Sequence, residues 1–460
     1  MDSISSFGLK SYEEAFGFLN KSLDYEKLIS YQYNASTFSL DRMFRLLAHV
    51  DNPHKEYPSL HITGTKGKGS ASIMLSTIFQ HAAYNTGLFT SPHLTDIKER
   101  IQLNHRNIPE TDFTEALNSL VPYIQHLRNT NPSESPTFFE TLTALCFLYF
   151  KKHKIDMAVL EVGMGGRLDS TNVVMPLVSI ITNIGLDHVN ILGHTISEIA
   201  YEKAGIIKKG IPVISAAEKQ DALSVIKEVC KEKSAPLYLL GKDIQINNAQ
   251  PSIKNGIKGL LCTIKTWQRT YENLFISLLG IHQAKNCAVA LGALEVLREQ
   301  NNISIDNETI RDALAHIRCP GRIEIFRENP LIILDYAHTV ESMASLRETL
   351  FENFTFGKLI IILGFSQDKE IDNILPEIVP CANIIFVAKS ANSRAASPED
   401  LAKKIKDIYG KQAKICDDVR QAVMGALRII SRNDLLCITG SAYIAGEAKK
   451  ELMCQSFAAV

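Results

Sequence analysis

The chain has 460 residues, of which 45% are hydrophobic and 22% are charged, a composition typical of a globular protein with two or three domains. The formal net charge is −1 and no block of basic residues stands out, which argues against a nucleic-acid partner. Nine cysteines occur without a C-x-x-C pair, the first residues lack the apolar core of a signal peptide, and no apolar run approaches the ~18 residues of a membrane span. We therefore expect a cytoplasmic protein without a membrane partner.

The first elements are helices, followed by a strand and a glycine-rich loop. Apolar residues at three- and four-residue spacing predict helices within residues 11–50. Residues 60–83, LHITGTKGKGSASIMLSTIFQHAA, then predict an apolar strand, a glycine turn and a helix that opens near Ser70. The glycines leave room for backbone N–H groups to close on phosphate oxygens, and the helix start adds the positive end of its dipole. This succession indicates a polyphosphate site.

The side chains of this loop fit the same interpretation. Lys68 would reach the β- and γ-phosphates, and the hydroxyl of Thr65 or Ser70 would help to position phosphate or metal. The strict pattern G-x-x-x-x-G-K-[ST] is absent, because Ile62 stands at its first glycine and Gly69 at its hydroxyl residue. The alternative is a glycine turn with incidental lysines, so the interpretation needs support from the rest of the chain.

Two segments follow the loop and its helix. Residues 87–103 open with an apolar patch and break into a polar stretch at Ser91, a pattern that by itself favours a surface turn. Residues 135–153 predict a buried helix, because Thr137 and Glu140 have the spacing of a capping box and an apolar run follows them.

Polar residues end two further apolar strands. Glu161 lies near the end of a strand at residues 157–162, and a strand within residues 177–189 leads to Asp187 and His188. In parallel α/β sheets ligands bind at the carboxyl ends of the strands, where the glycine loop also lies. A carboxylate in such a strand is costly unless it is paired or binds metal, so Mg²⁺ ligation by Glu161 is favoured over a surface position.

The helix predicted at residues 195–209 carries a lysine among apolar residues. Ile196, Ile199, Lys203 and Ile207 are spaced by 3, 4 and 4 residues, so the lysine lies on the apolar stripe. Periodicity alone favours a lysine that extends its amine to solvent. The alternative is a desolvated amine with a lowered pKa, suited to carbamate formation with CO₂ or to contact with an anion.

The second half of the N-terminal part contains strands and a helix. Alternating apolar and polar stretches predict a few antiparallel strands at residues 235–273. A helix at residues 281–300 then begins with the polar residues His282, Gln283 and Asn286, which by themselves are typical of a helix cap.

After residue 301, short apolar strands alternate with helices, which predicts a smaller doubly wound α/β domain. We therefore divide the chain into residues 1–302 and 303–460. Asp335 and His338 end the first strand of the second domain and would face the first domain across a cleft. Arg322 lies in a tight turn near the join, where it is either a phosphate ligand or a surface arginine.

Eleven motifs in register resemble those of folylpolyglutamate synthase and dihydrofolate synthase, a branch of the Mur ligase superfamily. They are GTKGKGS, TSPHLTDIKERI, FFETLTA, EVGMGGRLDSTN, GLDHVNILG, IAYEKAGIIK, HQAKNCAVA, PGRIE, LDYAH, DKE and GSAYIAGE. The match as a whole runs from about residue 11 to residue 447. The resemblance implies a P-loop-type α/β domain with a mainly parallel sheet, which holds the ATP and pterin sites, and a smaller Rossmann-like C-terminal domain.

The resemblance also implies roles for individual residues. They are an ATP loop (Gly64, Thr65, Lys66, Gly67, Lys68, Gly69, Ser70), nucleotide contacts (Asn286, Arg322, Asp335), Mg²⁺ ligands (Ser91, Glu161, His188), a carbamylated lysine that holds metal (Lys203) and pterin-binding stretches (Thr137, Phe138, Phe139, Glu140, Leu168, Asp169, Ser170). The match reverses the surface-turn interpretation of Ser91. Three residues depart from the family: Lys66 and Cys319 stand where Asn and often Trp occur, and Thr339 stands where Asn usually follows LDYAH.

The implied reaction is ATP-dependent amide formation. ATP phosphorylates a carboxylate of dihydropteroate or a reduced folate, and the amine of L-glutamate attacks the acyl phosphate, with Lys68 and two Mg²⁺ sites stabilising charge. From its strand edge we place His338 near the incoming glutamate. The alternatives are another Mur ligase that acts on a different acid, such as a cell-wall precursor, and a nucleotide-binding module without ligase activity. The motifs do not separate dihydropteroate from reduced folate as acceptor, and the family suggests a monomer.

Overall fold

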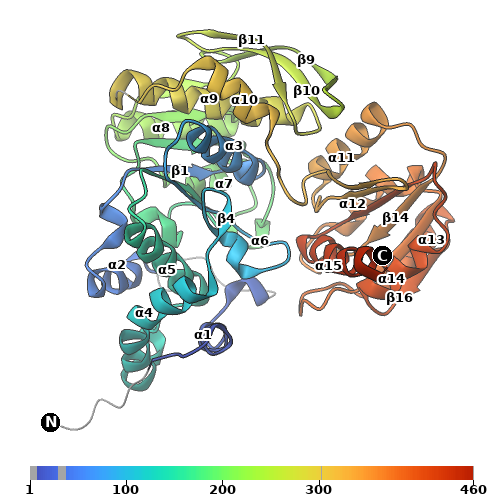
Figure 1. The fold of residues 1–460 in the computed structure, drawn as a ribbon, viewed down its shortest axis with the longest axis horizontal. Helices are drawn as coiled ribbons and strands as arrows, with labels where there is room; N and C mark the ends of the chain where they lie inside the picture. The colour runs from blue at the N-terminus through green and yellow to red at the C-terminus, as the bar shows by residue number, and fades with distance from the viewer. Residues whose placement is uncertain (1–7, 29–37, 302, 459–460) are drawn as a thin grey trace.

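The computed structural model describes residues 8–28, 38–301 and 303–458. Figure 1 shows two α/β parts side by side, the N-terminal part in blue to yellow and the smaller C-terminal part in orange to red. Each part is built around its own sheet, and the larger sheet is mainly parallel. The predicted fold class is therefore confirmed. Among the described residues, no helix has both the length and the apolarity required to cross a bilayer.

The large sheet has eight strands in the order β4-β3-β2-β5-β1-β6-β7-β8. Its strands are β1 (Ser59–Thr63), β2 (Thr86–Phe89), β3 (Ile101–Leu103), β4 (Arg106–Asn107), β5 (Met157–Glu161), β6 (Val178–Ile181), β7 (Val213–Ser215) and β8 (Leu237–Leu239). All neighbours from β2 to β8 are parallel, and β3 and β4 add an antiparallel edge. Since β1 pairs with β5 on one side and β6 on the other, the loops that follow these three strands meet at one edge.

Helices cover both faces of this sheet. On one face, Met157 and Val159 of β5 pack with the helices α3 (Lys68–His81), α9 (His282–Asn301) and α10 (Asn307–Ala315). On the other face, Ala158 and Leu160 pack with α1 (Tyr12–Leu19), α2 (Leu40–His49), α4 (Glu110–Thr130) and α5 (Phe138–Lys152). The central strands are buried on both faces, which explains their continuous apolar sequences.

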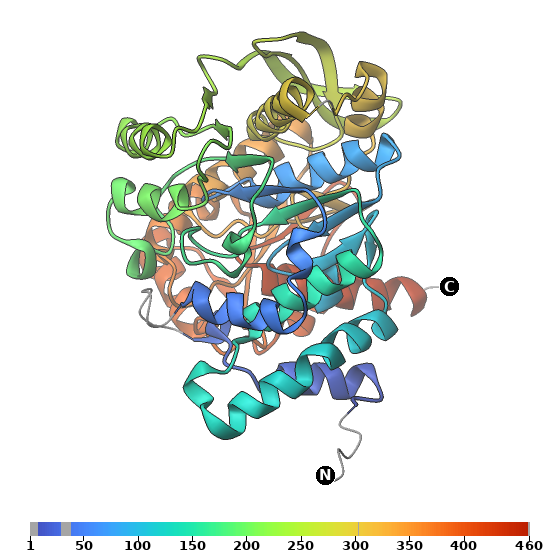
Figure 2. The ribbon, with the colours of Figure 1, turned by 90° about the vertical axis from the view of Figure 1, so that its left-hand side faces the viewer.

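The remaining elements of the N-terminal part confirm the sequence predictions in outline. Beside β6 and β7 lie α6 (Val189–Leu192), α7 (Ile196–Ala204) and α8 (Gln220–Glu232). The strands β9 (Gln245–Lys254), β10 (Ile257–Lys265) and β11 (Thr270–Ile276) form the expected antiparallel sheet, which lies at the top in Figures 1 and 2. The antiparallel prediction was wrong for β8, which pairs parallel with β7 in the large sheet. The helices predicted within residues 11–50 are α1 and α2, while residues 29–37 lie outside the described part.

The C-terminal part holds a six-stranded sheet in the order β12-β13-β17-β14-β15-β16. Its elements are β12 (Glu324–Glu328), β13 (Leu331–Leu334), α11 (Val340–Asn353), β14 (Leu359–Leu363), α12 (Ile371–Ile378), β15 (Ile384–Ala388), α13 (Pro398–Tyr409), β16 (Ala413–Cys416), α14 (Val419–Leu427), β17 (Leu435–Thr439) and α15 (Ala442–Ala458). Only β12 is antiparallel to its neighbour. Hydrophobic clusters occupy both faces, as in a doubly wound fold.

The connection between the two parts packs with the N-terminal core. Helix α10 contacts α3, and the hydrophobic cluster around the large sheet continues through Ile317 to Cys319. The division at residue 302 stays a prediction. This packing supports a later boundary, between Cys319 and the start of β12 at Glu324.

Candidate active site

The glycine loop turns sharply between β1 and α3. Gly64 and Gly67 have φ angles of 152° and 84°, and Gly67 caps the helix. A Cβ atom at Gly67 would lie 2.1 Å from the Oδ1 atom of Asn286, so only glycine fits there. Helix α3 begins at Lys68, two residues before Ser70, because the left-handed Gly67 serves as its N-cap. The loop therefore presents the amino end of a 14-residue helix to an adjacent cavity.

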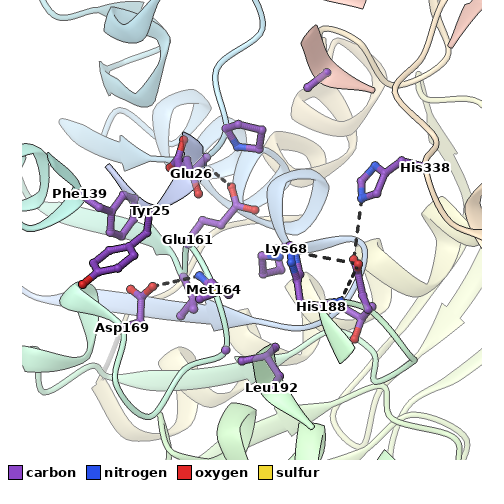
Figure 3. Close-up of a pocket in the computed structure, with 18 of the residues that line it drawn as sticks. Tyr25, Glu26, Lys68, Phe139, Glu161, Met164, Asp169, His188, Leu192 and His338 are labelled. Carbon is purple, nitrogen blue, oxygen red and sulfur yellow. Dashed lines mark hydrogen bonds and ion pairs between the residues drawn. The ribbon is translucent and has the colours of Figure 1, made fainter. Parts of the chain in front are cut away.

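This cavity, of about 250 Å³, lies between the two α/β parts. Its walls include the first five loop residues, Gly64 to Lys68. Figure 3 shows Lys68, His188 and His338 at one end, Tyr25, Phe139 and Asp169 at the other, and Glu161 between them. Gly69 lines a neighbouring groove, and Ser70 is buried. Residues that end or follow three different strands, Lys68, Glu161 and His188, thus line one cavity, as expected for the carboxyl edge of a parallel sheet.

The side chains of the loop are partly engaged with the protein itself. Lys68 Nζ donates to the carbonyl oxygen of Gly64 at 3.2 Å, so the lysine curls back over the turn. Thr65 Oγ1 donates to the carbonyl oxygen of Gly185 at 3.1 Å and accepts from its N–H at 3.0 Å. The threonine hydroxyl therefore holds the loop against the segment after β6.

Glu161 and Ser91 meet in the cavity. The backbone N–H of Ser91 donates to Glu161 Oε2 at 3.1 Å, so Ser91 is a cavity residue and the interpretation of a surface turn is wrong. The carboxylate is 97% buried, and its burial raises its pKa, an effect that the nearby Lys68 partly offsets. No described residue forms an ion pair with it. A buried carboxylate beside a hydroxyl and a phosphate loop fits the oxygen ligands that Mg²⁺ prefers.

Lys203 is buried rather than extended to solvent. Its side chain reaches the loop, where Nζ donates to the carbonyl oxygen of Gly64 at 2.9 Å, and the residue is only 4% exposed. Burial lowers the pKa of this lysine to about 7. The amine is therefore largely neutral just above neutral pH, which is the form that reacts with CO₂. The preference for a solvent-directed lysine was wrong.

His188 lines the same cavity as Lys203. It caps α6 with a φ of 52°, and desolvation lowers its pKa to about 3, so the imidazole is neutral and free to bind a cation. Within residues 8–28, 38–301 and 303–458, no three His, Cys, Asp or Glu side chains are grouped as a metal site. The donors present nevertheless fit Mg²⁺ if a lysine carbamate and phosphate oxygens complete the ligand sets.

Asp187 connects the two α/β parts. Its Oδ2 atom accepts from Lys66 Nζ and its Oδ1 atom from Lys369 Nζ, both at 2.9 Å. His338 Nε2 lies 3.8 Å from the same carboxylate and 2.9 Å from Lys66 Nζ. Burial alone would raise the pKa of Asp187, but the neighbouring positive charges, Lys66 first, lower it well below its usual value. Sequence reasoning placed Asp187 at this edge without a role and gave Lys369 none.

The opposite end of the cavity is aromatic and contains a buried acid. Asp169 is 6% exposed, and its oxygens accept from the backbone N–H of Met164 and of Thr171, each at 3.0 Å. Burial raises the pKa of this carboxyl group. Figure 3 shows Phe139 and Tyr25 around it. Leu168 and Ser170 also line the cavity. This end suits a flat heterocycle with N–H donors.

Two residues of the predicted pterin set do not line the cavity. Phe138 is 4% exposed and packs into the core, because neighbouring positions on a helix point in different directions. Glu140 forms a buried ion pair with Arg42 at 2.7 Å and completes the capping box with Thr137. The capping box is confirmed, and only Thr137 and Phe139 of that stretch reach the cavity.

Of the three predicted nucleotide contacts, one lines the cavity and two do not. Arg322 lines the cavity, with its guanidinium 3.7 Å from the ring centre of Tyr336. Asp335 is buried and accepts from the backbone N–H of Ile323 at 3.0 Å, so it anchors the turn that carries Arg322. Asn286 is buried against the loop and does not line the cavity.

The C-terminal wall contains polar residues that sequence reasoning missed. Asp368 Oδ1 and Arg394 Nε are buried and have no hydrogen-bond partner among the described residues. The two side chains approach to 3.8 Å, and Ser366 and Tyr443 lie in the same wall. Asp368 belongs to the DKE motif, but no local pattern marked Arg394.

Comparisons with known proteins agree with this arrangement. Family models of the Mur ligase middle domain and of the Mur ligase, glutamate ligase domain match residues 62–294 and 321–442. The dihydrofolate synthase/folylpolyglutamate synthase of Bacillus subtilis is 36% identical over 416 residues, 90% of this chain and 94% of that protein. Folylpolyglutamate synthase from Mycobacterium tuberculosis complexed with ADP has a TM-score of 0.87 at 28% identity, covering 95% of this chain and 97% of that chain. The Thermotoga maritima enzyme has a TM-score of 0.81 at 31% identity, covering 96% and 97%.

Each of the two α/β parts is matched by a Mur ligase domain model, and the cavity between them is walled by a phosphate loop and by both parts, so the molecule is an ATP-dependent ligase of the Mur type. The 36% identity to the Bacillus subtilis relative extends over 90% of this chain, which assigns the chain to one family within the Mur ligases. The chain belongs to the dihydrofolate synthase/folylpolyglutamate synthase family.

Proposed function

We propose that this ligase joins L-glutamate to the carboxylate of a pteroate or folate. The observation that carries the proposal is the continuity of the cavity: an aromatic end with the buried Asp169 leads directly to Glu161, Lys68 and the phosphate loop. A pteroate whose pterin ring is held at the first end would direct its carboxylate toward the second. An acid without a heterocycle, such as a cell-wall precursor, would leave the Asp169 carboxyl group without a donor from the ligand.

The chemistry proceeds in two displacements. An oxygen of the acceptor carboxylate attacks the γ-phosphorus of ATP, ADP leaves, and an acyl phosphate forms. The amine nitrogen of glutamate then attacks the acyl carbon, phosphate leaves, and the nitrogen loses a proton as the amide forms. Lys68 and the amino end of α3 would neutralise the charge that develops on the transferring phosphoryl group.

We place the metal ligands as the family resemblance implies. Ser91 and Glu161 would hold one Mg²⁺, and His188 with a carbamate on Lys203 would hold a second, supplying positive charge beside the phosphates. The support is the burial of Glu161 and Lys203 and the neutral imidazole of His188.

We assign the glutamate subsite to the C-terminal wall. Arg394 and Asp368 offer a guanidinium and a carboxylate with unsatisfied buried atoms, which match the carboxylate and amino groups of an amino acid. His338 lines the same cavity, which supports its predicted place near the glutamate. The cytoplasmic localisation and the monomeric state stay predictions.

The test is acceptor-dependent phosphate release from ATP in the presence of L-glutamate, with product masses determined. We expect turnover with 7,8-dihydropteroate or tetrahydrofolate, and turnover with both would assign both steps to this enzyme. Turnover with neither acid, but with another carboxylic acid, would indicate a different Mur ligase. Equal ATP hydrolysis with and without any acid would indicate a nucleotide-hydrolysing module.

A further inference from the structure

Lys66 stands in the phosphate loop where the resembling family usually has Asn, but its ammonium is directed to the interface between the two α/β parts. Nζ lies 2.9 Å from Asp187 Oδ2 and 2.9 Å from His338 Nε2. The backbone of Lys66 is fixed on the other side, since its N–H donates to Asn183 Oδ1 at 2.6 Å and its carbonyl oxygen accepts from Thr182 Oγ1 at 2.6 Å. The side chain therefore extends from a rigid base to a residue of the C-terminal part.

The contact with His338 determines the state of the imidazole. An ammonium has only donors, so Nε2 of His338 must accept and cannot carry a proton. The proton then lies on Nδ1, which donates to the carbonyl oxygen of Tyr336 at 2.8 Å. Lys66 and the carbonyl oxygen of Tyr336 thus together fix the orientation and the tautomer of a ring that lines the ligand cavity.

The same ammonium belongs to a bridge between the phosphate loop and the C-terminal part. Asp187 lies between two lysines, Lys66 from the loop and Lys369 from the segment after β14. Of these two, only Lys66 also contacts His338 by a hydrogen bond. Both lysines neutralise Asp187, but of the two it is Lys66 that connects the phosphate loop to the imidazole of His338.

We propose that Lys66 is a positioning residue for amide formation: it holds His338, and with it the C-terminal wall, against the phosphate loop while glutamate reacts. The proposal rests on the proposed function, because it assigns Lys66 to the second of the two displacements. An incidental lysine would affect neither displacement, and a phosphate ligand would affect the first.

The first experiment separates the two displacements. Acyl phosphate formation is measured without glutamate, as the acceptor-dependent movement of an ¹⁸O label in ATP from the β,γ-bridging position to the non-bridging positions of the β-phosphate. Amide formation is measured with glutamate, by product mass. In Lys66→Met we expect ligation to fall at least about tenfold further than the exchange, with a raised KM for glutamate and partial recovery in Lys66→Arg. Lys68→Met serves as the comparison, because a phosphate ligand should lower both rates together.

The second experiment is a double-mutant cycle. If Lys66 acts through His338, the effects of Lys66→Met and His338→Gln on ligation will not multiply, and the double variant will resemble the more damaged single variant. Lys369→Met is the matched control, because it removes the other lysine on Asp187 and should combine multiplicatively with His338→Gln. Thermal unfolding midpoints of all variants identify any that fail to fold.

Two results would overturn the proposal. Equal losses of exchange and ligation in Lys66→Met would make Lys66 a phosphate ligand, and multiplicative effects in the cycle would remove the link to His338. If the wild-type protein neither exchanges label nor forms amide with any pteroate or folate tested, the proposed acceptor is refuted. That result differs from both results above, because it concerns the wild type and not the Lys66 variant.

Discussion

Lys203 Nζ donates to the carbonyl oxygen of Gly64, the first residue of the phosphate loop, at 2.9 Å. A carbamate would keep one N–H on the same nitrogen, so this hydrogen bond could survive carbamylation with the new carboxylate extending beyond it. The contact also explains the position of the lysine on an apolar stripe, because the polar partner comes from another segment of the chain.

We therefore expect the ligase activity to depend on CO₂ and to increase with pH around neutrality. The pKa of Lys203 is lowered to about 7 by burial, so below that pH the protonated amine cannot form the carbamate, and above it the neutral amine can. Enzyme kept without CO₂ at pH 6 and then given ¹³C-bicarbonate at pH 8 should gain a carbamate NMR signal and activity together. Lys203→Ala should show neither and lose about 100-fold in kcat. Full activity of Lys203→Ala would contradict the prediction.

Phe138 and Phe139 provide a matched pair for the acceptor site. Phe139→Ala should raise the KM for the pteroate acceptor and change the unfolding midpoint little, because this ring lines the cavity. Phe138→Ala should lower the free energy of unfolding by about 3–5 kcal/mol, since it empties a core position. Steady-state kinetics and thermal unfolding of both variants distinguish the two roles. The opposite pattern would mean that the wrong ring faces the ligand.

Arg394→Gln should raise the KM for L-glutamate, by about tenfold to 100-fold, and leave the KM for ATP nearly unchanged. The reason is the loss of a cation whose Nε has no partner within the described chain. Arg420, with 72% of its side chain exposed, provides the control, and Arg420→Gln should have no effect on either constant. An unchanged KM for glutamate in Arg394→Gln would place the amino acid elsewhere.

His61 should make the protein less stable in acid. Thr171 Oγ1 donates to Asp169 Oδ1, so His61 Nε2 donates to Thr171 Oγ1 at 2.8 Å, and the buried Nδ1 has no partner among the described residues. Burial lowers the pKa of His61 to about 3, well below the ordinary histidine value of 6.5. The unfolded chain thus binds the proton first, and stability falls as the pH drops from 6.5 toward 3, by about 1.4 kcal/mol per pH unit.

The measurement is the unfolding midpoint of wild type and His61→Gln between pH 7 and pH 4.5. Glutamine keeps a donor for Thr171 and has no charge to gain, so its midpoint should depend less on pH, and the other histidines should contribute equally to both proteins. Parallel curves would show that His61 does not titrate in this range.

The strands and their polar ends were predictable because both signals are local. An apolar run followed by glycine, by Glu161 or by Asp187 and His188 specifies a strand and its edge, and the rules of parallel sheets bring such edges together. The alternation of apolar strands and helices after residue 301 predicted the C-terminal part in the same local way. The eleven motifs added Ser91, whose own surroundings favoured a surface turn.

Other features depend on contacts between distant residues. Phe138 and Phe139 are chemically identical in sequence, and only the packing of α5 determines which one faces the cavity. Periodicity placed Lys203 on the buried stripe, but its polar partner is 139 residues away. The contact between Lys66 and His338 spans 272 residues, and no local pattern encodes it.

The position of β1 in the sheet also affects synthesis of the chain. Both of its neighbours come much later in the sequence, since β5 begins at Met157 and β6 at Val178. At about 5–20 residues per second, a ribosome needs roughly 5–20 s to proceed from the end of β1 to the end of β5. During that interval the buried residues Leu60 and Ile62 have no strand to pair with, so the nascent chain passes through a stage that favours binding by chaperones.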